Sequence, residues 1–355
     1  MAIETLKNKI PQAPIAIWSI TPNGKILGQK IKDGLKGSTL FVSAKIGKND
    51  KREKNTIIFE KLSKKIQFEF NKFSGHVFIF STGIAVRIIA PLLNSKIVDP
   101  GVVVVDDNGI NAISLISGHL GGANELTKKI AAIISGTPVI TTATDINNLP
   151  AIDLIAKDKG LFIETPQNIK HINMAFLMGE PVSLFDPFDF IKNDLPKPFW
   201  TNKSIEDHAI KKIFCSYETR EVSRETLILR PPVLSIGIGC NRGTSCKELK
   251  QFLFMVLKKE NLSVHSICQF ATADIKKDEI GLLALSKEMK IQIVFYDKKN
   301  LNSVKTIMTP STMVEKHLGV KSVCEAAAIL AASNGKLIVP KKKTKDVTLA
   351  VAIKK

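Results

Sequence analysis

Short apolar runs rich in β-branched residues alternate with amphipathic stretches along this chain of 355 residues. This alternation is typical of α/β proteins, in which strands and helices follow one another. Strands are predicted at residues 15–20, 40–43, 77–80, 102–105, 111–116, 138–142, 233–237, 291–296, 336–339 and 348–353. Helices are predicted at residues 83–93, 124–135, 151–158, 169–178, 245–259, 278–290 and 323–333. The predicted fold class is α/β, with two or three α/β domains and glycine-rich strand-to-helix turns.

The length also predicts two or three domains, at roughly 150 residues for each. Residues 1–145 are predicted to form an N-terminal α/β domain and residues 231–355 a C-terminal α/β domain. Residues 146–230 are less periodic and are interpreted as a middle or linker region. A linker is predicted at residues 220–232, where a charged stretch gives way to two prolines.

The chain is strongly basic, with 51 Lys plus Arg against 33 Asp plus Glu and a formal net charge of +18. Such a charge suits nucleic acid, an anionic membrane or a polyanionic small molecule. Only six of the 51 cations are arginine, and they are spread singly. Proteins that recognise specific nucleic-acid sequences rely on arginine, so this composition argues against a sequence-specific nucleic-acid-binding protein. No run of 18 apolar residues occurs, which argues against a membrane span.

Five cysteines, an odd number without clustering, predict reduced thiols and hence a cytoplasmic protein. The charged N-terminus is not followed by the apolar core of a signal peptide.

The densest polar cluster surrounds His119, between a predicted strand and a predicted helix. Gly118, Gly121 and Gly122 suggest that the backbone there approaches a bound molecule closely. The ordinary pKa of histidine suits a general base at neutral pH. Asn124 and Glu125 are predicted in the first turn of the helix, pointing back toward the loop. The alternative is a flexible connection that carries an ordinary loop histidine.

Thr142 and Asp145 follow the next predicted strand and are expected to line the same crevice as His119. As caps of the following helix they would need no further function. Asp99, Asp106 and Asp107 are interpreted as turn residues. A metal site made from His119 and the carboxylates of these residues and Asp145 is not supported by their spacing, so no metal is predicted.

A second polar turn follows the strand at residues 77–80. Ser81, Thr82 and Gly83 open a helix there, and Arg87 is expected about one turn into it. A helix N-terminus with an arginine nearby is a typical anion site. Helix capping and a surface arginine would explain the same residues.

A third glycine-rich turn joins a predicted strand to a helix near residue 245. It contains Gly239, Cys240, Arg242, Gly243 and Thr244. Its glycine spacing fits neither the dinucleotide fingerprint nor the P-loop. The turn is therefore predicted to bind an anion at the helix start without being a nucleotide site. Cys240 as a nucleophile has no histidine near it in the sequence.

Several stretches together resemble the cobalt-precorrin-5A hydrolase (CbiG) family of anaerobic cobalamin biosynthesis. The N-terminal part of that family is similar to STGIAVRIIAPLL, DPGVVVVDDNG, ISLISGHLGGANELTKKIA and PVITTATD. The C-terminal domain of the family, which also exists alone as the CobE-like protein of the aerobic pathway, is similar to SIGIGCNRGTSCKEL, VCEAAAILAA and TLAVAIKK.

The resemblance implies a reaction on a cobalt-corrinoid that carries several carboxylates. Its lactone is opened with water, and a two-carbon fragment leaves as acetaldehyde. The cobalt arrives with the substrate, so the expected cofactor is none. Residues 1–145 are expected to hold the hydrolytic chemistry, and the C-terminal domain to bind or pass on the corrinoid. Other enzymes of the cobalamin pathway and a second copy of this chain are further expected partners, whereas nucleic acid and membranes are not.

This chemistry suggests a role for each residue near the first turns. His119 is the hypothesised base, and Glu125 orients it or alternates with it. The amides of Gly121 and Gly122 would stabilise the oxyanion, and Arg87 would hold a substrate carboxylate. Two alternatives stay open: a corrinoid-binding or transfer protein without turnover, and a nucleic-acid-binding α/β protein suggested by charge alone.

Overall fold

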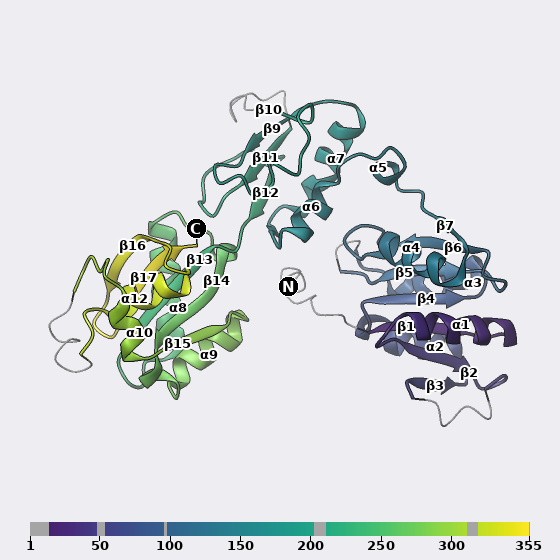
Figure 1. Cartoon of the computed structure of the whole chain (residues 1–355), viewed down its shortest axis with the longest axis horizontal. Coiled ribbons are helices and arrows are strands. Elements are labelled where there is room, and N and C mark those ends of the chain that lie inside the picture. Colours follow the sequence, from purple (N-terminus) through teal and green to yellow (C-terminus); the bar gives the residue numbers. More distant parts are fainter. Residues whose placement is uncertain (1–13, 48–53, 96–97, 202–210, 311–318, 355) are drawn as a thin grey trace. The chain divides into compact units, whose positions relative to one another are not determined.

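The computed structural model describes residues 14–47, 54–95, 98–201, 211–310 and 319–354 (Figure 1). The chain divides into two compact units. Met1–Lys157 and Asn173–Glu180 form the first, and Asp158–Ile172 and Pro181–Lys355 form the second. Each unit is described by itself.

The first unit is built on a seven-stranded sheet with the order β3-β2-β1-β4-β5-β6-β7. Its strands are β1 Ile15–Ser19, β2 Thr39–Ser43, β3 Thr56–Phe59, β4 Gly75–Ile79, β5 Gly101–Val105, β6 Asn111–Ile116 and β7 Thr137–Val139. Strands β1 to β5 run parallel, β6 is antiparallel to β5, and β7 is parallel to β6. The carboxyl ends of β6 and β7 therefore lie at the opposite edge from those of β1 to β5.

Helices cover both faces of this sheet. On one face, α1 (Pro22–Gly34) and α4 (Ala123–Ile134) bury apolar side chains against the strands. On the other face, α2 (Leu62–Glu69) and α3 (Thr82–Ile89) pack over an aromatic-rich core. The sheet is thus the middle of three layers. This arrangement buries both faces of the sheet, which suits strands whose side chains are apolar on both sides.

A buried histidine lies inside the aromatic core of the first unit. Trp18 stacks on Phe41 with ring centroids 4.1 Å apart and donates its indole N–H to Nδ1 of His76 over 3.1 Å. Because an indole can only donate, Nδ1 carries no proton, and Nε2 donates to the carbonyl of Phe70 over 2.9 Å. Burial lowers the pKa of His76 to about 4. His76 is therefore neutral at physiological pH.

Three shorter helices, α5 (Ala143–Ile146), α6 (Ile152–Asp158) and α7 (Ile169–Leu177), follow β7 along the chain. The second unit then contains a five-stranded sheet with the order β10-β9-β11-β12-β8. Its strands are β8 Phe162–Ile163, β9 Val182–Phe185, β10 Trp200–Thr201, β11 Lys212–Cys215 and β12 Leu227–Arg230.

The linker predicted at residues 220–232 is wrong in part, because β12 occupies its second half. Leu227 and Leu229 are fully buried in this strand. Arg230 is also buried, and its guanidinium donates to the carboxylate of Glu164 and the carbonyl of Ser216. In the sequence, a four-residue strand that ends in arginine looks like part of a polar linker. The partners of Arg230 lie far from it in the chain, so the sequence does not show that this arginine is buried and paired.

The second unit also contains a five-stranded sheet with the order β15-β14-β13-β17-β16. Its strands are β13 Leu234–Cys240, β14 Ile267–Ala273, β15 Ile293–Tyr296, β16 Lys336–Lys343 and β17 Val347–Ile353. Its helices are α8 Cys246–Lys259, α9 Ile280–Met289, α10 Lys298–Ser303 and α12 Val323–Ala331. Strands β13 to β15 run parallel, and β17 pairs antiparallel with β13.

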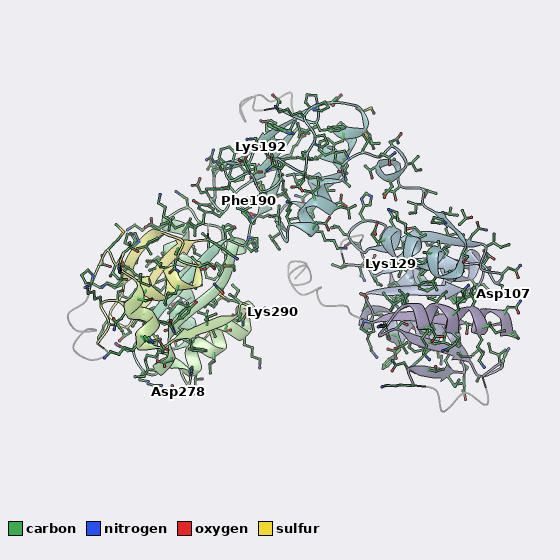
Figure 2. The ribbon with its side chains drawn as sticks, in the orientation of Figure 1. Asp107, Lys129, Phe190, Lys192, Asp278 and Lys290 are labelled. Atoms are coloured by element: carbon green, nitrogen blue, oxygen red, sulfur yellow. The ribbon has the colours of Figure 1, made fainter. Side chains whose placement is uncertain are left out.

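The α/β class is confirmed, and each strand and helix predicted from the sequence has a counterpart in the structure. Elements without a strong pattern were not predicted, namely β3, α2, α5, β8 to β12, β14 and α10. Lysines such as Lys129, Lys192 and Lys290 project from the surface, as Figure 2 shows. Among the described residues, no helix is long and apolar enough to cross a membrane.

Candidate active site

The loop between β6 and α4 folds back on itself and presents His119. Ser117 adopts a positive φ of 56° and Gly122 one of 81°. The backbone N–H of Ala123 donates to the carbonyl of Ser117 over 3.1 Å, and that of Gly122 donates to the carbonyl of His119 over 2.9 Å. A Cβ on Gly121 would overlap Ser117, so this tight path needs glycine there.

His119 lies between two carboxylates. Its Nε2 is 2.8 Å from Oδ2 of Asp145, which follows β7, and its Nδ1 is 3.2 Å from Oδ2 of Asp153 in α6. The side chains of His119 and Asp153 are only 12% and 7% exposed, while that of Asp145 is 21% exposed. Asp145 is therefore the carboxylate more open to a substrate or to water.

This arrangement favours a charged imidazole ring. A neutral histidine has one N–H, so it cannot donate to two carboxylates at once. The hydrogen bond to Asp153 raises the pKa of His119 against the effect of burial, and Asp145 raises it further. Burial acts to raise the pKa of Asp153, but His119 and the amide of Asn173 outweigh it and lower that pKa. The two directions agree, and both favour the imidazolium form of His119.

Asn124, at the start of α4, links the loop to the end of β7. Its Nδ2 donates to Oδ2 of Asp145 over 2.9 Å and to Oγ1 of Thr142 over 3.1 Å. Its Oδ1 accepts from the hydroxyl of Ser114 over 2.6 Å. A Cβ on Gly118 would lie 2.7 Å from that same oxygen, so Gly118 leaves room for Asn124. These contacts bring Thr142 and Asp145 to the same group of side chains as Asn124, and a crevice shared with His119 stays a prediction.

Glu125 is not near His119, contrary to its predicted role. Its side chain is 65% exposed and pairs with Lys128 at 3.1 Å, because the helix turns it away from the loop. Asp145 and Asp153 hold the histidine instead. The amide of Gly122 is already used within the loop, so its predicted role as an oxyanion donor does not fit this conformation.

Sequence analysis missed Asp153 and Asn173 as members of this group. Asn173 donates to Oδ1 of Asp153 over 3.1 Å. The Thr144 hydroxyl, which belongs to the same polar run after β7 as Thr142 and Asp145, lies 3.2 Å from Nε2 of His119. Asp153 and Asn173 lie on helices, where an isolated polar residue is expected on the solvent side and does not indicate a site.

Ser81, Thr82, Gly83 and Arg87 lie at the other edge of the sheet, at the carboxyl end of the parallel strand β4. The antiparallel course of β6 carries His119 to the opposite edge. Arg87 is exposed and donates to the carbonyl of Gly83 over 3.2 Å. The structure therefore does not bring Arg87 and its turn to the histidine.

The third predicted turn lies between β13 and α8. Arg242 is held by Asp278 at 2.5 Å and by the carbonyl of Ile275, while the amide of Gly243 donates to the buried Glu279. These carboxylates already occupy the cations and amides expected to bind an anion. Burial raises the pKa of Cys240, which disfavours its role as a nucleophile.

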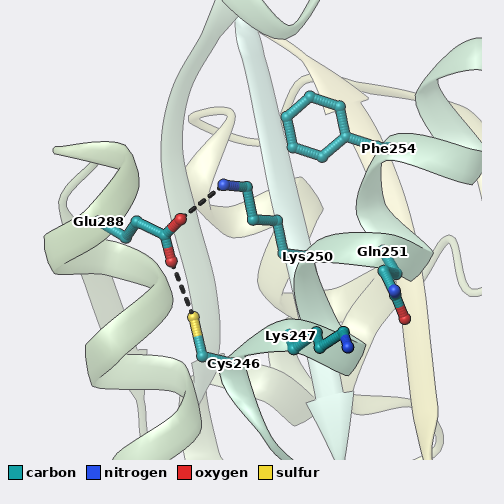
Figure 3. Close-up of a pocket in the computed structure, with 6 residues that line it drawn as sticks. All are labelled: Cys246, Lys247, Lys250, Gln251, Phe254 and Glu288. Atoms are coloured by element: carbon teal, nitrogen blue, oxygen red, sulfur yellow. Dashed lines mark hydrogen bonds and ion pairs between the residues drawn. The ribbon is translucent and has the colours of Figure 1, made fainter.

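Arg242, Gly243 and Thr244 do line a hollow of about 480 Å³, whereas Gly239 and Cys240 do not. A neighbouring pocket of about 690 Å³ lies between α8 and α9 (Figure 3). It is lined by Cys246, Lys247, Lys250, Gln251, Phe254 and Glu288. Among the described residues, no group of three or more His, Cys, Asp or Glu side chains has a geometry that could hold a metal ion.

Three family models match consecutive parts of the chain. Cobalamin synthesis G N-terminal matches residues 64–145, Cobalamin biosynthesis central region matches 150–231, and Cobalamin synthesis G C-terminus matches 234–352. The chain belongs to the cobalamin synthesis G (CbiG) family. The resemblance stated from the sequence is thus confirmed.

Two relatives match almost the whole length of the CbiG chain, and a third matches about a third of it. A cobalt-precorrin-5A hydrolase of Priestia megaterium is 33% identical over 353 residues, which cover 95% of this chain and 94% of the relative. A cobalt-precorrin-5A hydrolase of Salmonella typhimurium is 30% identical over 356 residues, covering 98% and 99%. Protein CobE of a Sinorhizobium species is 27% identical over 110 residues, covering 31% of this chain and 71% of CobE.

Proposed function

We propose that this CbiG chain is a cobalt-precorrin-5A hydrolase that opens the substrate lactone and releases acetaldehyde to give cobalt-precorrin-5B. The full-length similarity to hydrolases of that name supports the substrate. The observation that carries the chemistry is the imidazole of His119 between the carboxylates of Asp145 and Asp153. This group contains an acid, a base and an orienting carboxylate in one place.

In the first step, Asp145 takes a proton from water as the oxygen attacks the lactone carbonyl. The positive charge of His119 stabilises the oxyanion that forms. When the carbon–oxygen bond of the lactone breaks, His119 protonates the leaving alkoxide. This step leaves a free carboxylic acid, an alcohol, a protonated Asp145 and a neutral His119. Because His119 begins as a cation, we assign it to the acid in this step, in place of the base suggested by the sequence.

In the second step, the neutral His119 accepts the proton of the new alcohol. The adjacent carbon–carbon bond breaks, its electron pair stays with the macrocycle, and acetaldehyde leaves. Asp145 returns its proton to the carbon that received the electrons. Both residues regain their starting charges, and the carboxylic acid releases one proton to solvent. The cobalt belongs to the substrate, so no resident cofactor enters this scheme.

The surface charge supports a substrate with many carboxylates. A formal net charge of +18 attracts a polyanion over long range, and most of this charge is lysine. The flexible lysine stem meets carboxylates from many directions. The free cysteines among the described residues support a reducing, cytoplasmic location. A homo-oligomer and contacts with other cobalamin-pathway enzymes stay predictions.

The test is an anaerobic incubation of the protein with cobalt-precorrin-5A, with acetaldehyde trapped as a hydrazone and the corrinoid followed by mass spectrometry. We expect one equivalent of acetaldehyde for each lactone opened. His119→Ala and Asp145→Asn should each abolish most of this release, and the exposed Glu125→Gln should not. Tight binding of the substrate with an intact lactone and no aldehyde would instead identify a corrinoid-transfer protein.

A further inference from the structure

The buried carboxylate of Asp153 has a second partner besides His119. Oδ2 faces the imidazole, while Oδ1 accepts a hydrogen bond from Nδ2 of Asn173 over 3.1 Å. Asp153 is on α6 and Asn173 is on α7, yet both belong to the first compact unit. The two oxygens of one carboxylate are thus divided between a histidine and an amide.

The backbone fixes which way the amide of Asn173 points. Its Oδ1 accepts from the N–H of Ile152, the first residue of α6, over 3.1 Å. This N–H has no acceptor within the helix, because the first N–H groups of any helix lack one. Since Oδ1 is used there, the NH₂ group must face Asp153. Asn173 therefore caps α6 and donates to its carboxylate with the same side chain.

These contacts hold Asp153 in one orientation. A carboxylate that is buried needs donors on both oxygens, and it turns when one donor is lost. The charged groups around His119 are Asp145, Asp153 and the ammonium of Lys157, which donates to the carbonyl of Leu120 over 3.2 Å. Of these, Asp153 is the most buried carboxylate and has the best-defined surroundings.

We propose that Asn173 is a positioning residue of the hydrolase: it locks Asp153 against Nδ1 of His119 and so keeps the imidazole doubly protonated and correctly turned toward Asp145. The inference rests on the proposed function for its effect on turnover, but not for its effect on the histidine. It also assigns a role to the central region of the family, since residues 150–231 contain both Asp153 and Asn173. Residues 1–145 then lack part of the site.

Asn173→Leu is the sharpest variant for the full-length chain. A leucine at this position is close to asparagine in size and adds no charge, and it removes both functions of the side chain, the cap of α6 and the donation to Asp153. The matched control is Asn147→Ala, because Asn147 belongs to the same unit and its amide only donates to the carbonyl of Ala143. Asn173→Ala removes both functions and provides a second variant.

Two measurements test the proposal. The first follows the imidazole proton of His119 by NMR against pH, with His119→Gln to assign the signal. We expect its pKa to fall in Asn173→Leu and in Asn173→Ala, and to stay unchanged in Asn147→Ala. The second is the rate of acetaldehyde release, for which kcat should fall roughly tenfold to a hundredfold, with KM within about twofold. The alkaline limb of the pH profile should move to lower pH.

An unchanged titration of His119 in both folded variants overturns the positioning role, whatever the rates are. The titration does not need turnover, so it also separates this inference from the proposed function. If the wild-type chain releases no acetaldehyde, but His119 titrates lower in Asn173→Leu than in wild type, the hydrolase is refuted and the positioning role stands. If Asn173→Leu does not fold, the titration of Asn173→Ala decides.

Discussion

Nδ1 of His119 lies 3.2 Å from Oδ2 of Asp153, although 34 residues separate them in the chain. The glycine-rich turn after β6 brings the histidine to this contact, and the first turn of α6 brings the carboxylate. The hydrogen bond to Asp153 raises the pKa of His119. His119 in turn lowers the pKa of Asp153, although the burial of that carboxylate acts in the opposite direction. Both shifts stabilise the ion pair, which sets the charge of the site before any substrate binds.

Replacing the buried carboxylate tests this charge. Asp153→Asn leaves the shape of the side chain but removes its charge, so the pKa of His119 should fall. We expect kcat for acetaldehyde release to fall roughly 10²-fold or more, since a positioned acid–base group contributes about 10²–10⁴. Asp158→Asn, an exposed change at the end of the same helix, is the control. Equal rates for Asp153→Asn and wild type would remove the ion pair from the mechanism.

The pH profile follows from the raised pKa of His119. The first step needs its protonated form, so activity should persist above the ordinary pKa of histidine, about 6.5, and fall as the pH rises through the raised value. The stability from the ion pair has the same sign: it is present below about pH 6.5 and is lost through the folded-state pKa. The check is kcat against pH for wild type and Asp153→Asn. An alkaline limb that does not move between them contradicts this assignment.

The choice of base separates Asp145 from Glu125. Asp145 contacts Nε2 of His119, whereas Glu125 is exposed beside Lys128. Asp145→Asn should reduce kcat roughly 10²–10⁴-fold. Glu125→Gln should leave kcat within about twofold, because an exposed ion pair contributes little. Both are measured by acetaldehyde release. A large loss in Glu125→Gln with an active Asp145→Asn would reverse the assignment.

Part of this site was predictable because the sequence encodes it locally. The apolar runs of β6 and β7 and the glycines between β6 and α4 place His119, Asn124 and Asp145 at one edge, since these two strands run parallel. The position of Arg87 at the other edge was not predicted, because the sequence analysis assigned Arg87 to the site of His119. The turn at Gly109, which adopts a φ of 70°, is the signal that could have shown it, since β6 returns antiparallel there and so reverses the edge.

Asp153 and Asn173 could not be found in the same way. Their role depends on contacts between residues that lie far apart in the chain, with 34 positions between His119 and Asp153 and 20 between Asp153 and Asn173. Neither helix begins with a motif that marks a ligand. The short strands β8 to β12 were missed for a different reason. They contain two to four residues each, which is too few to show the alternation of a strand.

His76 predicts how the first unit responds to acid. Its pKa is lowered by burial to about 4, while an unfolded histidine has about 6.5. The unfolded chain therefore binds a proton over this range that the folded chain does not. This difference adds to the free energy of unfolding in full above pH 6.5. The contribution is lost as the pH falls toward 4, where the free energy of unfolding is lower by about 3 kcal/mol.

Urea unfolding at pH 7 and pH 4, followed by Trp18 fluorescence in a Trp200→Phe background, measures this loss. His76→Gln is the matched variant, because a glutamine amide can still accept from Trp18 and donate to the carbonyl of Phe70. We expect its pH dependence between 6.5 and 4 to be smaller than that of wild type. The same loss in both proteins would show that other groups cause the acid sensitivity.

Gly237 in β13 predicts a sharp difference between two glycines of one strand. A Cβ on Gly237 would overlap the carbonyl oxygen of Cys324 and lie 2.8 Å from the backbone nitrogen of Ala328, both in α12. The backbone of that helix cannot move aside cheaply, because α12 is buried along most of its length. A Cβ on Gly239, two residues further along, would meet only the side chain of Thr348.

Gly237→Ala should therefore destabilise the second unit by about 3 kcal/mol or more, and Gly239→Ala by about 1 kcal/mol. Thermal unfolding followed by circular dichroism compares the two full-length variants, with acetaldehyde release as a second readout. Equal melting temperatures for both variants would mean that α12 does not pack on β13 as closely as the structure shows.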